Sequence, residues 1–506
     1  MIELLVRFKE MSHFYISSGV TAACIFWVYY RQRKGAAGLW PVIILNFTLF
    51  IAWGVLSGLN HDDVAFLHFS WLISQGQVPF KDFWEHHSPF LPVLTAPFLK
   101  SAPHSPLIFD IARIFSGCVF VLNILLGWRI ARQVWQAKAR LSVYLLMVSG
   151  ACIFAQYLFL RPDIFMISFV LAGISVCLDI PRKGAVYCLL SGVAFGLAMS
   201  FITKQYLLIF LPVIAVFLGV KSGRAARLAA YAAGLCAGIL PLAAYLFSAG
   251  IIGDFLSWAV GFNGRALHIS VNFPLIFIAA ATAGAVVLMR RFRLSGDVKA
   301  AILFYALVLG TFSSLTSISD QSGFLYYLGL WYFICAIAVS GAGLPELLAQ
   351  APSRWKRSLI AGIVLGALLS PNFVYVWKYR HGDYFRDKQA VASLMEYTRD
   401  STCVVILPVH PVFAVDATRL YSNWQLYFMG KFPSVRLDAV QDGLAQRIIS
   451  IRPAVVMCRF GKKDFILELY QRKIITSSEY KELIAFLTAN YRQKQIGDNV
   501  YYLKTL

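Results

Sequence analysis

The sequence predicts an all-α polytopic membrane protein with a small C-terminal α/β domain outside the membrane. Two observations lead to this fold class. Of the 506 residues, 59% are hydrophobic and only 14% are charged, which is far too apolar for a soluble chain of this length. Several apolar runs also approach the ~20 residues that a helix needs to cross ~30 Å of hydrocarbon.

These runs predict about twelve transmembrane helices, or about eleven if the first run lies in the membrane interface. The first run is followed by the basic cluster RQRK, the wrong flank for a cleaved signal peptide, so we expect a retained helix. The expected boundaries are about 13–30, 38–57, 106–130, 141–159, 164–180, 185–202, 205–220, 228–248, 271–289, 299–316, 323–341 and 357–376.

The charge of the connections predicts the orientation. Every second connection is short and basic, and these connections hold 19 Lys and Arg residues against five on the opposite side. Lys and Arg accumulate in cytoplasmic loops, so the loop 58–105 and the C-terminal tail are expected outside the cytoplasm. The bias also explains the net charge of +21 without a nucleic-acid partner.

Three regions follow from this pattern. Residues 1–37 hold the first helix and its basic turn, and residues 38–378 hold the other spans and the expected site. Residues 379–506 have ordinary charge density and no spanning run. In this last region, periodicity predicts strands at 403–409, 454–460 and 498–506, and helices at 464–472 and 478–493.

The outer loop 58–105 begins with two adjacent acids, Asp62 and Asp63, directly behind an apolar run. VAFLHFSWLIS (64–74) follows, and it is apolar enough to lie flat in the interface as a helix. A carboxylate partly shielded from water can titrate near the working pH and act as a general base. Alternatively, one of the two acids caps a helix that begins at Val64, which would not exclude catalysis.

Further along the same loop, the stretch FKDFWEHHSP is rich in polar and aromatic residues. It carries Asp82, His86 and His87, and either histidine could contact a phosphate or transfer a proton. The alternative is that both histidines are ordinary interface residues of an aromatic loop. Asp82 is a further acid within reach of the same chemistry.

Three charged residues lie at the outer edges of later spans. Arg161 and Asp163 form RPD at the start of one span, and Lys204 separates two spans that are almost continuous. Charges at the membrane edge are expensive and usually have a partner, so these residues favour a site with an anionic lipid ligand. Alternatively, Arg161 and Lys204 extend towards lipid headgroups.

The order of these features resembles the GT-C membrane glycosyltransferases, in particular the branch of protein O-mannosyltransferases and aminoarabinose transferases. The resemblance covers about residues 38–376. It rests on an acid pair behind an early span, an interfacial helix, G-x-x-P-F-x-D-F (76–83), H-x-P-hydrophobic (87–90), an arginine early in the next span (Arg113), RPD (161–163) and a lone TK (203–204).

The resemblance implies roles for individual residues. Asp62 would be the catalytic base and Asp63 would support it or position the acceptor. His87 and Lys204 would contact the donor phosphate, and Asp163 matches an acid of the family. The chain departs from the pattern with Asp at 63, where many relatives have Glu, and with His at 87, where the aminoarabinose branch has Lys.

The implied reaction is inverting transfer of a sugar from a polyprenyl-phosphate donor to a glycan, lipid or protein acceptor. Lys204, Arg161 and His87 would stabilise the departing phosphate. No metal site is evident, although a divalent cation at Asp62 and Asp63 stays possible. The resemblance places such an enzyme in a bacterial inner membrane, with its site and C-terminal domain on the extracytoplasmic side.

Two other classes of membrane protein stay open as alternatives. A polyprenyl-lipid transporter or flippase often shows repeated halves and ionisable residues in mid-span, and the sequence shows neither. An O-antigen ligase or polymerase uses a large late outer loop, whereas the large polar loop of this chain comes early. The position of the acids therefore favours the transferase.

Overall fold

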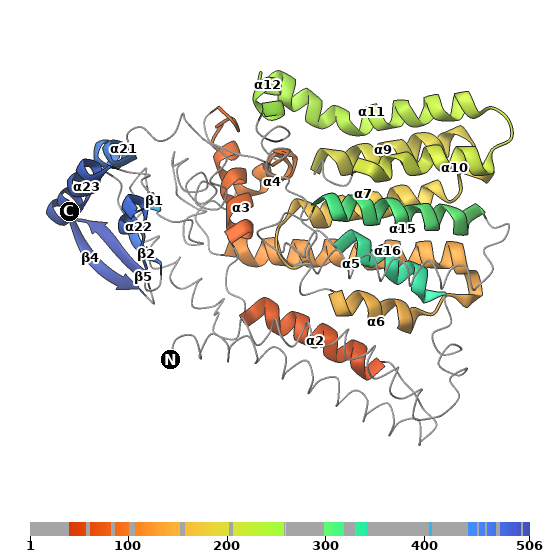
Figure 1. The fold of residues 1–506 in the computed structure, drawn as a ribbon, viewed down its shortest axis with the longest axis horizontal. Coiled ribbons are helices and arrows are strands. Elements are labelled where there is room, and N and C mark those ends of the chain that lie inside the picture. The colour runs from red at the N-terminus through yellow and green to blue at the C-terminus, as the bar shows by residue number, and fades with distance from the viewer. Residues whose placement is uncertain are drawn as a thin grey trace.

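The computed structural model describes much of the helical region and part of the C-terminal region (Figure 1). The described residues are 40–56, 61–81, 87–100, 107–151, 157–201, 206–257, 259, 298–317, 329–341, 404–406, 444–452, 455–460, 463–471, 476–496 and 499–505.

Long helices run side by side through the described part of residues 40–341, roughly along the horizontal direction of Figure 1. They coincide with predicted spans, whereas the predicted spans near 13–30, 271–289 and 357–376 lie outside the described residues. The helices are α2 (Trp40–Leu56), α5 (Leu107–Trp135), α6 (Leu141–Ala151), α7 (Pro162–Cys177), α9 (Ala185–Phe201), α10 (Leu211–Gly219), α11 (Arg224–Ser248), α15 (Val298–Ser317) and α16 (Gly329–Ser340).

Two helical stretches, Ile108–Lys138 and Arg224–Ser248, are long and apolar enough to cross a membrane by themselves. Both keep large apolar side chains on the surface. Ile114 of α5 is 66% exposed and Phe247 of α11 is 79% exposed, which is unfavourable in water and ordinary in lipid. Length, composition and exposure therefore agree with an integral membrane protein.

Two further helices, α3 (His61–Ser74) and α4 (Phe90–Lys100), lie at one end of the long helices. In Figure 1, α3 runs across the direction of α5 rather than along it, as the sequence predicts for a helix in the interface. The two helices are joined by a buried contact of 2.6 Å between the hydroxyls of Ser70 and Thr95. A turn with a positive φ at Gly76 follows the end of α3.

Helices α9 and α11 approach closely because glycines face each other along both helices. A Cβ on Gly192 would collide with the backbone of Tyr231, and a Cβ on Gly196 would collide with that of Leu235. Small residues of this kind allow helix backbones to approach in a membrane, where no hydrophobic force drives helices together. The close packing of α9 on α11 fixes the position of α9, including both of its ends.

The opposite end of the helices carries most of the Lys and Arg in the described part of residues 40–341, and we call it the basic end. It contains the end of α5, a 3₁₀ turn (Gln136–Lys138), the end of α7, α8 (Ile180–Lys183) and the starts of α9, α11 and α15. Its ten cations are Arg129, Arg132, Lys138, Arg140, Arg182, Lys183, Lys221, Arg224, Arg227 and Lys299.

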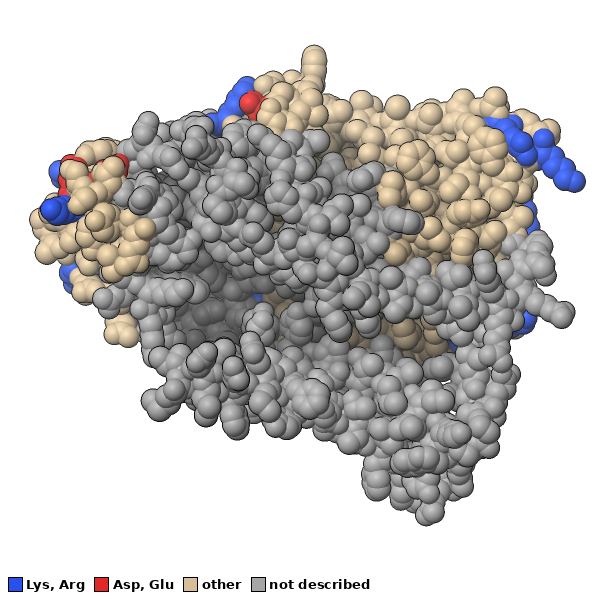
Figure 2. Space-filling view, viewed as in Figure 1, with Lys and Arg blue, Asp and Glu red and all other residues tan. Residues whose placement is uncertain are grey.

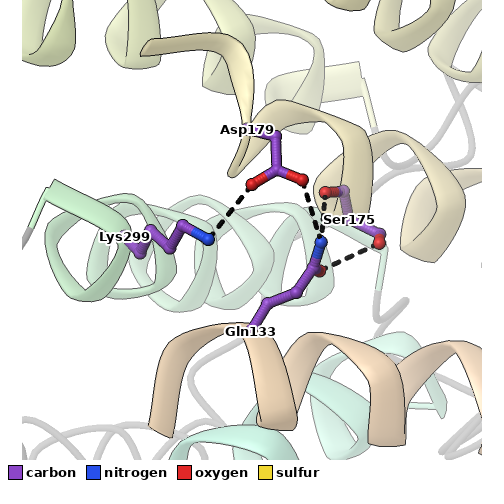
Figure 3. Close-up of polar contacts among 4 residues, drawn as sticks. All are labelled: Gln133, Ser175, Asp179 and Lys299. Carbon is purple, nitrogen blue, oxygen red and sulfur yellow. Dashed lines mark hydrogen bonds and ion pairs between the residues drawn. The ribbon is translucent and has the colours of Figure 1, made fainter. Parts of the chain in front are cut away.

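A polar cluster ties α5, α7 and α15 together at the basic end (Figure 3). Lys299 donates to Asp179 at 3.1 Å, and Gln133 donates to the other oxygen of the same carboxylate at 3.4 Å. Ser175 donates to Gln133 at 2.9 Å. The negative charge of Asp179 is thus compensated inside the protein.

The described C-terminal residues form a small α/β unit. A sheet has the strand order β1 (Val404–Ile406), β2 (Val455–Phe460), β5 (Asn499–Lys504) and β4 (Tyr491–Ile496), with the short β3 (Lys463–Asp464) paired to β2. Strand β1 is parallel to β2, and the other pairs are antiparallel. The helices are α21 (Leu444–Ile451), α22 (Phe465–Gln471) and α23 (Ser477–Asn490), which confirms the predicted class.

Two predicted boundaries were wrong. For the expected span 141–159, the structure describes helix to Ala151 and a turn at Tyr157 and Leu158, and residues 152–156 lie outside the described residues. The expected span 205–220 begins with a 3₁₀ turn, Tyr206–Phe210, because Pro212 cannot donate a backbone hydrogen bond within a helix. The helix expected over 478–493 ends at Asn490, and β4 then pairs with β5 in a tight hairpin.

Candidate active site

The structure describes some of the predicted site residues and not others. Arg161, Asp163 and His87 are described with their side chains, whereas Asp62 and Asp63 are described as positions of α3 only. Asp82, His86 and Lys204 lie outside the described residues. The site is therefore built from the first five residues and from the segments that flank the other three.

Asp62 and Asp63 occupy the first turn of α3, because this helix begins at His61. The alternative in which they precede a helix that starts at Val64 was therefore wrong in its boundary. Acids in a first turn interact favourably with the positive end of the helix dipole. Helix α3 starts shortly after α2 ends at Leu56, so the acid pair belongs to the end of the helices opposite the basic end.

Arg161 and Asp163 form a buried ion pair at this end. Nε and Nη2 of Arg161 donate to the same oxygen, Oδ2 of Asp163, at 3.2 and 3.1 Å. The two side chains are only 6% and 9% exposed. Arg161 has an extended backbone, Pro162 opens α7 and Asp163 lies in its first turn, so the chain turns sharply enough to bring the two side chains together.

This pairing changes the role expected of Arg161. The prediction treated Arg161 as a cation available to a phosphate and Asp163 as a separate acid. In the structure, the carboxylate of Asp163 compensates much of the positive charge of Arg161, so the pair is close to neutral. Burial of both groups is expensive, and leaving either one alone would cost far more than the pair.

Arg113 is a second buried cation. In the sequence it was noted only as part of the family resemblance, and no role was predicted for it. It is 8% exposed, and its Nη1 donates to the carbonyl oxygen of Gly54 in the last turn of α2. Its guanidinium carbon lies 5.2 Å from the centre of the Phe159 ring. Arg113 therefore joins the end of α2, which leads into the acid pair, to the segment that leads into Arg161.

His87 lies against the interfacial helix. Its ring is half-buried, and its centre is 5.3 Å from that of Phe66 in α3. The next residue, Ser88, donates a hydrogen bond to the carbonyl oxygen of Ser200 near the end of α9. The segment around His87 is thus fixed between α3 and α9.

An aromatic cluster joins the remaining elements of this end. The ring of Phe201, the last residue of α9, lies 4.9 Å from that of Phe90 and 5.6 Å from that of Phe165. Phe90 follows His87 closely, and Phe165 follows Asp163 closely. Phe201 is also the last described residue before Lys204. Phe201, the described residue that precedes Lys204, therefore lies beside the segments of His87 and Asp163.

The cation at position 81 has a structural explanation. Lys81 donates to the carbonyl oxygen of Ala249 at 3.0 Å, directly after α11, where the negative end of the helix dipole favours a cation. Phe80 has a positive φ of 67°, unusual for a bulky residue, and its ring packs 6.1 Å from that of Phe255 in α12 (Ile252–Phe255). These contacts hold the outer loop against α11 and α12.

We call this end of the helices the site end. It contains the first turn of α3 with the acid pair, the ring of His87, the Arg161–Asp163 pair and Arg113. The described guanidinium groups of Arg113 and Arg161 are buried at this end. Among the described residues, no three His, Cys, Asp or Glu side chains gather as metal ligands would.

No family model matches the sequence, and no curated protein matches it. Solved structures match in fold. ArnT from Cupriavidus metallidurans in the apo state is 11% identical, with a TM-score of 0.54 over 91% of this chain and 97% of that chain.

Two structures of an oligosaccharyltransferase from Archaeoglobus fulgidus also match. The one with Zn and sulfate has a TM-score of 0.42 and 14% identity over 78% of this chain and 57% of that chain. The other, AglB with an inhibitory peptide and a dolichol-phosphate, has a TM-score of 0.49 and 11% identity over 92% and 74%.

The ArnT match spans almost the whole of both chains, and at 11% identity it shows the fold alone. It confirms, at the level of fold, the resemblance that the order of the sequence motifs predicted. The chain therefore has the fold of ArnT.

Proposed function

We propose that this protein is an integral-membrane glycosyltransferase that uses a polyprenyl-phosphate-linked sugar as its donor. The acceptor is a glycan, a lipid or a protein. The basic end faces the cytoplasm, and the site end and the region 379–506 lie outside it, in a bacterial inner membrane. Asp62 is the general base, and Asp63 supports it or positions the acceptor.

The observation that carries this proposal is the convergence at the site end. The start of α3, the ring of His87 and the buried charges of Arg113, Arg161 and Asp163 come from segments far apart in the sequence. Buried charges at a membrane edge are rare without a function. A GT-C fold with this cluster at the start of its outer helices supports transfer of a sugar from a lipid phosphate.

The reaction is a single displacement with inversion. The acceptor oxygen bonds to the anomeric carbon while the bond from that carbon to the phosphate oxygen breaks. The electron pair leaves with the lipid phosphate, and the acceptor proton passes to Asp62. The developing negative charge is stabilised by Lys204, by His87 and by Arg161, with Asp163 orienting the guanidinium of Arg161.

Two further residues complete the proposed site. Asp82 and His86 belong to the same outer loop as His87, and they bind the donor or the acceptor near the acid pair. A phosphate leaving group needs little protonation, so this scheme has no general acid. A divalent cation at the acid pair would add positive charge at the leaving group, and the test below includes its removal.

The test is donor consumption by the purified protein in lipid vesicles, with a panel of polyprenyl-phosphate sugars and with or without a chelator. Loss of a general base typically costs about 10²–10⁴-fold in rate, so Asp62→Asn should abolish measurable transfer. Asp254→Asn, in the first turn of α12, is the matched control and should keep the activity.

Two results would contradict this assignment in different ways. Full activity in Asp62→Asn would remove Asp62 as the base and direct the search to Asp63 or Asp82. If the wild-type protein bound polyprenyl lipids but consumed no donor, the transferase itself would be wrong. A ligase-like enzyme or a flippase would then become the better hypothesis.

A further inference from the structure

Two turns of the basic end lie against each other. One turn is α8 with Gly184, and the other joins α10 to α11. Arg227 of α11 donates to the carbonyl oxygen of Ile180 at 2.9 Å. Pro181 packs so closely on Gly219 that a Cβ there would collide with the proline ring. The turns therefore present one continuous surface.

This surface, which we call the two-turn patch, is strongly positive. Its exposed cations are Arg182, Lys183, Lys221 and Arg224. Asp179 beside it is already compensated by Lys299 at 3.1 Å, as Figure 3 shows. In Figure 2, blue side chains gather at the right-hand end of the molecule, where α10 leads into α11.

Exposed apolar side chains lie directly beside these cations. Phe217 is 56% exposed and Leu218 is 44% exposed at the end of α10, and Val186 is 62% exposed at the start of α9. The guanidinium of Arg224 lies 5.5 Å from the centre of the Phe217 ring. An apolar surface bordered by cations has the layout of a boundary between hydrocarbon and headgroups.

Two cations of the patch also contact other groups of the protein. Arg224 donates to the carbonyl oxygen of Val220 at 2.7 Å, and the ammonium of Lys183 lies 5.3 Å from the centre of the Tyr187 ring. Both contacts fix the cations near the end of the apolar surface, where they can contact a ligand. Lys221 and Arg182 extend the charge along the two turns.

We propose that the two-turn patch binds the headgroup of an anionic phospholipid, whose acyl chains lie along Phe217, Leu218 and Val186. The cations contact the phosphate and any further acidic group of the headgroup. Exposed apolar side chains beside the cations favour an amphiphile over a soluble anion or a nucleic acid. This proposal needs the membrane placement of the chain but is independent of the proposed sugar transfer.

The test is native mass spectrometry of the full chain titrated with phosphatidylglycerol or, in parallel, with phosphatidylcholine. Wild-type protein should bind phosphatidylglycerol with clear preference. Each basic residue near a membrane surface changes affinity for anionic lipid about fivefold, so a triple Arg182→Gln, Lys183→Gln, Lys221→Gln variant should lose roughly a hundredfold.

A matched control removes the same charge elsewhere. The triple variant Lys481→Gln, Arg492→Gln, Lys494→Gln changes exposed cations of the C-terminal unit and should keep the preference. Unchanged binding of phosphatidylcholine by both triple variants would show that both are folded. If the patch variant misfolds, a photoreactive phosphatidylglycerol bound to the wild type should cross-link to the peptides around 182–187 or 217–224.

Three results would overturn the proposal. The first is equal affinity of the wild type for both lipids. The second is an unchanged preference for phosphatidylglycerol in the patch variant. The third is cross-linking of the photoreactive lipid only to peptides outside the two turns.

Discussion

The two ends of the helices use charge in opposite ways. At the basic end, most cations are exposed, and the ion pair of Lys299 and Asp179 keeps 18% and 20% of its side chains exposed. At the site end, the side chains of Arg161 and Asp163 are only 6% and 9% exposed, and Arg113 is 8% exposed. Exposed charges cost little and indicate contact with headgroups, whereas buried charges must be held by partners and indicate a site.

The largest expected difference between the ends concerns their ion pairs. Asp163→Ala leaves the buried guanidinium of Arg161 without its carboxylate, which should lower the free energy of unfolding by about 3–5 kcal/mol. Asp179→Ala at the basic end should cost less, about 1.5–3 kcal/mol, because the partly exposed Lys299 left behind can be solvated. Thermal unfolding of both variants in the same detergent measures this difference. Equal losses of stability in the two variants would contradict the difference between the two ends.

A second contrast uses two arginines of the same helix. Arg113→Met removes a charged hydrogen bond to Gly54 and the contact with Phe159, a loss of about 1.5–3 kcal/mol at the site end. Transfer of sugar should also fall, by up to about 100-fold, because Arg113 holds the end of α2 that leads into the acid pair.

Arg132→Met is the matched control for this contrast, since Arg132 is exposed at the basic end of α5. Its rate of transfer should stay within about twofold of the wild type, because exposed charges contribute little. If both variants lost activity to the same degree, burial would not explain the importance of Arg113.

A third prediction concerns the helix that connects the two ends. A Cβ at position 196 would meet the backbone of Leu235 and Gly238, so Gly196→Ala should destabilise the protein by about 1–3 kcal/mol. Gly253→Ala, where no heavy atom lies near the new Cβ, should be almost neutral. Thermal unfolding measures both, and a neutral Gly196→Ala would contradict the close approach of α9 and α11.

The smallest expected effect concerns the outer loop. Lys81→Met removes the cation at the end of α11 and should cost about 0.3–1 kcal/mol. Hydrogen exchange of the backbone around Ala249 should become faster, whereas exchange at the basic end should not change. Unchanged exchange in this variant would show that Lys81 does not hold the loop.

Apolar runs were enough to predict the helices, because a spanning segment must satisfy its backbone internally and is therefore helical. The start of α7 followed from RPD, and the crosswise α3 followed from its composition. The strand β4 could not be predicted, because YRQKQI has little apolar alternation and depends on pairing with β5.

The chemistry of the site was less visible in the sequence than its location. The segments of Asp62, His87 and Asp163 were expected at one end, and the described parts do meet there. The ion pair of Arg161 and Asp163 depends on the extended backbone before Pro162, which no periodicity reveals. The contact of Arg113 with Gly54 joins residues from different helices, so only the fold discloses it.

The most direct test of the site end as the catalytic centre compares one acid from each end in the same transfer assay. Asp62→Asn and Asp179→Asn remove one negative charge each from folded protein in lipid vesicles. We predict that the first loses sugar transfer by about 10²-fold or more and that the second keeps it. Full activity in Asp62→Asn, or equal loss in both variants, would contradict the assignment of the site end as the catalytic centre.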